Sequence, residues 1–78
     1  MDNLRKYNEA FAENLNITED KLPDLTYQSI PEWDSVGHMQ LMAAIEDAFD
    51  IMLDTEDIID FSSYEKGKEI LEKYDVRF

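Results

Sequence analysis

Apolar residues recur at helical spacing in the first part of this chain. They predict a helix over roughly residues 3–15, with Asp2 or Asn3 as its N-cap. A long connection then runs from Asn16 to Asp34 and contains both prolines. Apolar residues scattered through it indicate that it is held against the core, and connections of this length in small domains are often functional. The apolar positions of the helix are Leu4, Tyr7, Phe11 and Leu15.

Three further helices are predicted in the second half of the chain, each opened by residues that cap helices well. The pattern is all-α and forms one domain over residues 1–78. We expect a small four-helix bundle with a long loop between its first two helices and a short third helix. The predicted ranges are from Asp34 or Ser35 to about Asp50, from residues 54–57 to about Asp60, and from Ser62 or Ser63 to near Tyr74.

The second predicted helix carries apolar residues on two sides. One side is an ordinary core stripe, whereas the other begins at Ser35 and mixes apolar with acidic residues. Single exposed apolar residues are common, but a contiguous group beside an exposed hydroxyl favours a surface that binds partners. The core side contains Leu41, Ile45, Ala48 and Phe49, with Met42 at its margin, and the outer side contains Ser35, Val36, Met39, Ala43, Glu46, Asp47 and Asp50.

The excess of acidic residues suggests that this outer surface is acidic and continues onto the third predicted helix. The chain has 19 acidic and 7 basic residues, a formal net charge of −12, and it has no lysine or arginine between Lys21 and Lys66. Nucleic acid and anionic membranes are disfavoured as partners because both attract positive charge. Basic protein surfaces suit this acidic face, with fast and salt-sensitive binding. The third helix is expected to add the acidic positions Asp54, Glu56 and Asp57.

Several classes of site are disfavoured by composition. Cysteine is absent, so disulfides and thiolate metal sites are not available. A single histidine, and acids at 54–60 without the spacing of a calcium loop, predict no metal site. No apolar run approaches the ~20 residues of a membrane span, and the first residues do not read as a signal peptide. We therefore expect a cytoplasmic protein.

The stretch from Glu32 to His38, EWDSVGH, contains the residue types of a hydrolytic triad. Its spacing does not suit catalysis, because Asp34 adjoins Ser35 instead of standing behind His38 to orient the imidazole. A domain of this size also buries only about 60% of its unfolded surface, which leaves little room for an enclosed active site. We predict no catalytic residue and interpret His38 as packed at the helix start. Ser35 remains either a helix cap or an attachment point, where the helix dipole favours a phosphate.

The chain resembles an acyl carrier protein in three segments: Asp34-Ser35-Val36 at the head of an acidic helix, LMAAIEDAFDI within it, and DTEDIIDF after it. The resemblance covers nearly the whole chain and implies a four-helix bundle without catalytic activity of its own. It implies that a phosphopantetheinyl transferase attaches 4′-phosphopantetheine from coenzyme A to Ser35, and that Asp34 assists this loading. The thiol of the arm would carry an acyl group as a thioester, which explains how a chain without cysteine performs this role.

The resemblance also implies a set of partners for a monomeric carrier. They are the transferase, a ligase or acyltransferase that loads the cargo, and downstream acyl-processing enzymes with basic surfaces. Positions that family members present to such enzymes correspond to the outer side of the second helix. These positions are Val36, Met39, Ala43, Glu46 and Asp47.

Two departures from primary fatty-acid carriers indicate a specialised fatty-acid, polyketide-like or other acyl-transfer pathway. Trp33 precedes the Asp-Ser pair, and Gly37 stands where many carriers have an acidic residue. Since glycine destabilises a helix interior, we hypothesise that Gly37 loosens the region around Ser35. Two alternatives stay open: an aminoacyl, D-alanyl or peptidyl cargo on the same arm, or an acidic adaptor whose Ser35 is never modified.

Overall fold

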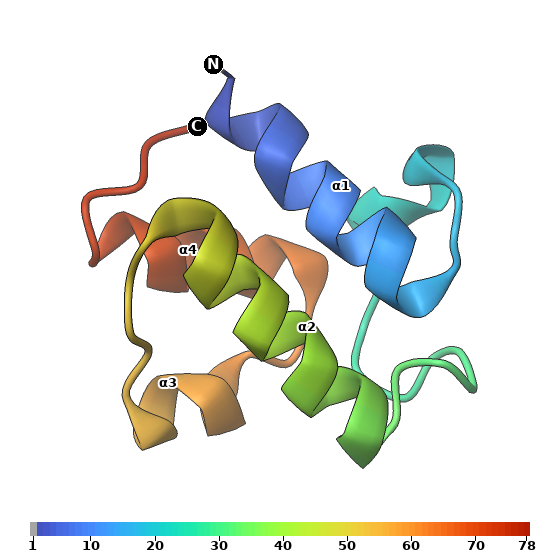
Figure 1. Cartoon of the computed structure of the whole chain (residues 1–78). Coiled ribbons are helices and arrows are strands. Elements are labelled where there is room, and N and C mark those ends of the chain that lie inside the picture. Colours follow the sequence, from blue (N-terminus) through green and yellow to red (C-terminus); the bar gives the residue numbers. More distant parts are fainter. Residues whose placement is uncertain (1) are drawn as a thin grey trace.

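The computed structural model describes residues 2–78 and contains four α-helices and one 3-10 helix (Figure 1). Between residues 2 and 78 the only β-type pairing is an isolated bridge joining Thr26 and Ser63. The all-α prediction is therefore confirmed, and the chain forms a small helical bundle. The elements are α1 (Asn3–Leu15), η1 (Glu19–Asp24), α2 (Ser35–Phe49), α3 (Thr55–Asp60) and α4 (Tyr64–Glu72).

Helix ends follow the capping residues of the sequence. The side chains of Asp2, Asp34 and Ser63 each accept a hydrogen bond from a backbone N–H in the first turn of α1, α2 and α4. These bonds satisfy groups that a helix start otherwise leaves unpaired. Asn16 and Asp50 end α1 and α2 in the left-handed conformation. The caps of α2 and α4 are thus Asp34 and Ser63, not Ser35 and Ser62.

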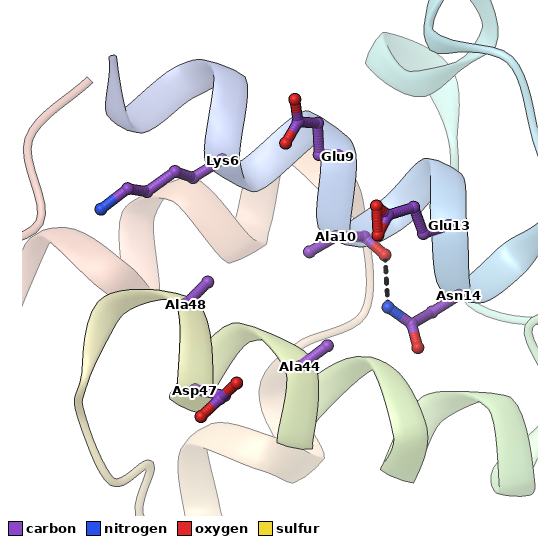
Figure 2. A pocket seen from close by; sticks show the side chains of 8 residues that line it. All are labelled: Lys6, Glu9, Ala10, Glu13, Asn14, Ala44, Asp47 and Ala48. Atoms are coloured by element: carbon purple, nitrogen blue, oxygen red, sulfur yellow. Dashed lines mark hydrogen bonds between the residues drawn. The ribbon is translucent and has the colours of Figure 1, made fainter. Parts of the chain in front are cut away.

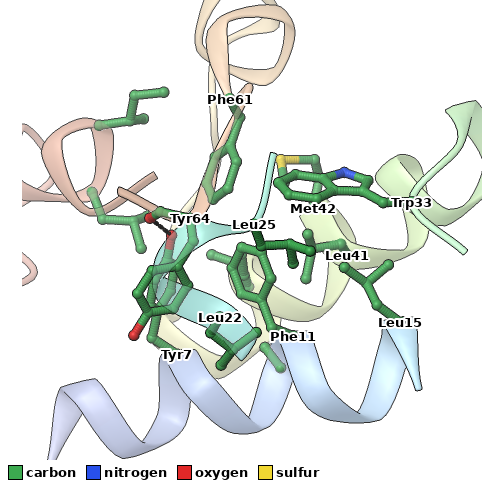
Figure 3. Packing of buried hydrophobic residues seen from close by; sticks show 14 of the residues in the cluster. Tyr7, Phe11, Leu15, Leu22, Leu25, Trp33, Leu41, Met42, Phe61 and Tyr64 are labelled. Atoms are coloured by element: carbon green, nitrogen blue, oxygen red, sulfur yellow. Dashed lines mark hydrogen bonds between the residues drawn. The ribbon is translucent and has the colours of Figure 1, made fainter. Parts of the chain in front are cut away.

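One hydrophobic core lies between α1, α2, α4 and the connection before α2 (Figure 3). The core stripe of α2 differs slightly from expectation. Met42 is fully buried, while Ala48 and Phe49 are only half-buried, so the helix is rotated toward the Met42 side. The largest fully buried side chains are Trp33, Tyr7, Phe11, Phe61, Leu15, Leu22, Leu41, Met42, Ile45 and Leu71.

The long connection between α1 and α2 is packed against this core, as its apolar residues predict. It contains η1, whose Leu22 is buried, and Leu25 just after it is also buried. Backbone hydrogen bonds then join the connection to the start of α4, from Tyr27 N–H to the Ser62 carbonyl at 2.8 Å and from Tyr64 N–H to the Leu25 carbonyl at 3.0 Å. These attachments fix the path of the chain as it approaches Ser35.

The short helix α3 is held to the segment after α4 through Asp57, which corrects the sequence prediction. Asp57 is buried rather than exposed. Its carboxylate accepts hydrogen bonds from Lys73 Nζ at 2.6 Å and from the Tyr74 hydroxyl at 2.5 Å. The Tyr74 hydroxyl in turn accepts the backbone N–H of Asp54 at 3.0 Å. Asp57 therefore anchors α3 and does not belong to the exposed acidic surface.

Replacing Asp57 with asparagine is expected to lower Tm at neutral pH by roughly 5 °C. Hydrogen bonds from Lys73 and Tyr74 hold the pKa of the Asp57 carboxyl below its usual range. A lowered folded-state pKa contributes stability above the unfolded pKa of about 3.9, and this contribution is lost as the pH falls through the folded-state pKa. The Tm difference between the parent and D57N should therefore shrink below about pH 4. Melting curves across pH check this, with the exposed Glu56→Gln as the control; a difference independent of pH would contradict it.

Candidate functional site

Ser35 is the first residue of α2, and its side chain is exposed. Capping of this helix is performed by Asp34, whose Oδ1 accepts the Gly37 N–H at 2.8 Å. The Ser35 hydroxyl makes no hydrogen bond within residues 2–78. It thus lies at the positive end of α2 without a structural task, and it is free to form a covalent bond.

Trp33 anchors the chain two residues before Ser35. Its side chain is fully buried and makes edge contacts with Phe11, at a ring-centroid distance of 5.5 Å, and with Tyr27, at 6.1 Å. The burial of so large a ring holds the end of the connection firmly onto α1. The buried Trp33 therefore fixes where α2 begins.

His38 joins this anchor to α3. Trp33 Nε1–H donates to His38 Nδ1 at 2.9 Å, and the two ring planes are inclined by only 19° with their centroids 6.1 Å apart. Since Nδ1 accepts, the proton of the neutral ring lies on Nε2, which donates to the Ile58 carbonyl at 2.7 Å. Both ring nitrogens are engaged, so neither is available to take a proton from Ser35. The expected packing of His38 at the helix start is confirmed.

Gly37 has a packing role that replaces the hypothesis of a loosened helix. It is buried, and a Cβ at this position would lie 2.0 Å from the backbone carbonyl oxygen of Glu32. Only glycine lets the connection approach the first turn of α2 so closely. The absence of a side chain therefore tightens the region before Ser35 and does not free it.

Gly37→Ala is expected to destabilise the fold by about 1–3 kcal/mol, because the added methyl group displaces the backbone at Glu32. Helix propensity alone predicts the opposite sign, a gain of about 1 kcal/mol. Denaturant unfolding measures the sign, and amide exchange around Ser35 should become faster. The exposed Gln40→Ala on the same helix is the control. A more stable Gly37→Ala variant would contradict the packing role.

The predicted partner surface on α2 is largely exposed. Glu46 is the exception, because it is half-buried. Its Oε2 accepts a hydrogen bond from the backbone N–H of Leu53 at 2.8 Å, which holds the loop after α2 against the helix. Two further large apolar residues that the sequence analysis did not predict to be exposed, Met52 after α2 and Ile59 in α3, are 85% and 73% exposed. The predicted residues that are exposed are Ser35, Val36, Met39, Ala43 and Asp47 on α2, with Asp34, Asp50, Asp54 and Glu56 outside it.

A groove of about 320 Å³ begins at Ser35 and runs between α2 and α3. Hereafter it is called the Ser35 groove. Apolar and aromatic side chains form most of it, and sequence analysis did not predict the contributions of Tyr27, Ile59 and Phe61. The adjacent isoleucines of α3 could have indicated an exposed apolar surface, because only one of two neighbouring side chains in so short a helix can face the core. The lining residues are Tyr27, Ser35, His38, Met39, Ile58, Ile59 and Phe61.

A second hollow, of about 250 Å³, lies between α1 and α2 (Figure 2). Alanines and charged side chains of both signs line it, and Asn14 Nδ2 donates to the Ala10 carbonyl beside it at 2.8 Å. It includes neither Ser35 nor Asp34. The Ser35 groove is thus the hollow that contains the candidate attachment point.

Comparisons with family models, with curated proteins and with solved structures give no match to this chain. Among residues 2–78, the helices are too short or too polar to cross a membrane. Within the same range, His, Asp and Glu side chains form no group of three or more that suits a metal ion. Inferences about function therefore rest on the sequence and on the geometry around Ser35.

Proposed function

We propose that this chain is a discrete acyl carrier protein that carries its cargo as a thioester on a 4′-phosphopantetheine arm attached to Ser35. One observation supports this most directly: Ser35 is an exposed first residue of α2 whose hydroxyl is not needed for capping. Backbone N–H groups at a helix start suit a phosphate there. The arm supplies the thiol that the chain, without cysteine, lacks.

Asp34 has two oxygens with separate roles in this proposal. Oδ1 caps α2 through Gly37, while the other oxygen remains for the metal-dependent loading reaction in the transferase. The exposed acidic and apolar residues of α2, from Val36 to Asp50, would meet basic patches on the transferase and on acyl-processing enzymes. The carrier is monomeric, non-catalytic and cytoplasmic in this proposal, within a four-helix bundle of the acyl carrier type.

Two substitutions at Asp34 should separate its roles. Asparagine caps helices as well as aspartate does, so Asp34→Asn should keep the parent Tm while slowing the loading rate by roughly tenfold or more, since it loses one charge-assisted contact worth about 1.5–3 kcal/mol. Alanine removes the cap as well, which costs about 1 kcal/mol and lowers Tm by about 4–8 °C. Thermal melts and initial loading rates by mass spectrometry measure both effects. Loading of Asp34→Asn at the parent rate would contradict the second role.

Intact mass spectrometry tests the proposed function itself. The purified chain is incubated with coenzyme A, magnesium and a broad-specificity phosphopantetheinyl transferase, beside a carrier protein known to be loaded under those conditions. We expect one phosphopantetheinyl group per chain. An unchanged mass while the control carrier is loaded would reject the proposal in favour of an unmodified acidic adaptor. Chemical release of the thioester from native protein distinguishes acyl from aminoacyl cargo.

A further inference from the structure

We propose that His38 is a pH-sensitive switch that sets the position of α3 against α2. Its neutral ring joins Trp33 to Ile58 through two hydrogen bonds, hereafter called the His38 bridge. Protonation of the ring breaks the bond to Trp33, moves the ring and shifts α3, whose isoleucines line the Ser35 groove. This inference goes beyond the proposed function, because the His38 bridge belongs to the unmodified chain.

The bond from Trp33 requires a neutral imidazole. Nδ1 of His38 accepts the indole N–H at 2.9 Å, whereas an imidazolium carries a proton on both ring nitrogens and has no acceptor. After protonation, two N–H groups would point at each other. Trp33 is fully buried, so its N–H would then be left without an acceptor in a place that water does not reach, which is costly.

The surroundings of His38 offer an imidazolium no compensating partner. Four residues pack against the ring, and only one of them is titratable: Tyr27 of the connection, whose ring centroid lies 5.2 Å away. The others are Trp33, Ile58 and Phe61. His38 is half-buried and forms no ion pair within residues 2–78. A charge placed there would lose hydration without gaining an opposite charge.

The acidic residues nearest to His38 on α2 and α3 are exposed or engaged elsewhere. Asp34, one turn earlier along the chain, caps α2. On α3, Asp57 binds Lys73, while Glu56 and Asp60 are exposed. None of these carboxylates pairs with the imidazole, so its protonation acts through the His38 bridge.

The helix α3 is loosely packed and therefore able to follow the ring. Among its residues only Asp57 is buried, and it has few contacts with the other helices. Two polar attachments hold it: the His38 bridge on the α2 side, and Asp57 bound to Lys73 at 2.6 Å on the other. The hydrogen bond from Lys73 holds the pKa of the Asp57 carboxyl below its usual range. Mild acidification therefore changes the first attachment and leaves the second in place.

The requirement for a neutral His38 also fixes the direction in which stability depends on pH. Imidazole in an unfolded chain takes up a proton below about pH 6.5. The unfolded state then binds more protons than a folded state that keeps the His38 bridge. The contribution of the bridge to stability is therefore present above this pH and is lost as the pH falls.

NMR of the unmodified chain reads the His38 bridge directly, because the single tryptophan gives one indole N–H resonance and the chain has one histidine. As the pH is lowered from about 7.5 to about 5, we expect the indole resonance and the amide resonances of Ile58 and Ile59 to shift together. Amide resonances of α1 should stay in place. Indole and α3 resonances that do not move over this range would overturn the proposal, as would a general unfolding that moves the resonances of α1 equally.

His38→Gln is the matched variant that does not titrate, since its amide offers an acceptor and a donor without taking up a proton. Both proteins contain the same acidic residues, so the difference between their Tm values isolates His38. We expect the parent to lose roughly 5 °C of Tm relative to His38→Gln between about pH 7.5 and about pH 5. Trp33→Phe, which removes the donor that opposes protonation, should give a loss in the same direction.

A Tm difference that is independent of pH, in whichever of the two variants folds, would overturn the proposal. Loading at Ser35 is measured separately by mass. Failure of the proposed function would therefore leave this test and its result unchanged.

Discussion

Ser35→Ala is expected to abolish attachment of the phosphopantetheinyl group completely while the Tm of the chain stays within about 2 °C of the parent, as for a surface substitution that breaks no contact. The loss follows because, under the proposed function, the hydroxyl oxygen of Ser35 is the atom that forms the phosphodiester. The stability is kept because Asp34, and not Ser35, caps α2. Intact mass after incubation with transferase and coenzyme A measures the first effect, and a thermal melt measures the second.

Ser62→Ala is the matched control for this experiment. Ser62 is also exposed and precedes the capping residue of α4, but it lies outside the Ser35 groove. We expect full loading of Ser62→Ala at the parent rate. Residual loading of Ser35→Ala, or loss of loading in Ser62→Ala, would place the attachment elsewhere and contradict the proposed function.

Trp33→Ala is expected to reduce the free energy of unfolding by about 3–5 kcal/mol, the usual cost of deleting a large buried aromatic side chain. For 78 residues the total is only roughly 4–12 kcal/mol, so this variant should be partly or wholly unfolded at room temperature. Trp33→Phe keeps a ring but leaves His38 Nδ1 without its donor, and it should cost about 1–3 kcal/mol.

Denaturant unfolding followed by far-UV circular dichroism measures both Trp33 variants, because the tryptophan fluorescence of the parent is lost in them. Met52→Ala is the control, since this large apolar side chain is 85% exposed and its loss should change stability by less than about 0.5 kcal/mol. An unfolding free energy of Trp33→Ala within 1 kcal/mol of the parent would mean that Trp33 does not anchor the connection.

Helix positions were predictable from the sequence because their signals are local. Capping residues and apolar spacing gave α1 the same bounds in sequence and structure, and they placed the start of α2 within one residue. The 3-10 helix η1 was missed, since it has six residues around Pro23 and is too short to show a periodic pattern.

Roles that depend on distant residues were not predictable. In the sequence, Asp57 resembles the other acidic residues of a charged helix. The residues that bind its carboxylate, Lys73 and Tyr74, follow only 16 and 17 residues later. Gly37 reads as a weak point in a helix, because the Glu32 carbonyl that excludes a Cβ is brought there by the path of the connection. In both cases the local sequence pattern does not show the contacts that the folded chain makes at these residues, and these contacts come from distant segments.

The candidate site was likewise predictable from the sequence only where its residues are adjacent in the chain. Ser35 and Asp34 are adjacent in sequence, so their relation to the helix start could be predicted directly. The Ser35 groove combines Tyr27, Met39 and Ile59 from three separate segments, and only the folded chain brings them together. Sequence patterns therefore identified Ser35 as the candidate attachment point but did not identify the surface beside it.

The anchoring of α3 by Lys73 and Tyr74 makes one wall of the Ser35 groove dependent on residues that follow the last helix. A shortened version of the chain that ends at Glu72 would keep Ser35, Asp34 and every groove residue, yet it would lack both ties to Asp57. Designs that fuse or trim this domain should therefore retain the segment after α4, since its removal alters the geometry beside Ser35 without changing Ser35 itself.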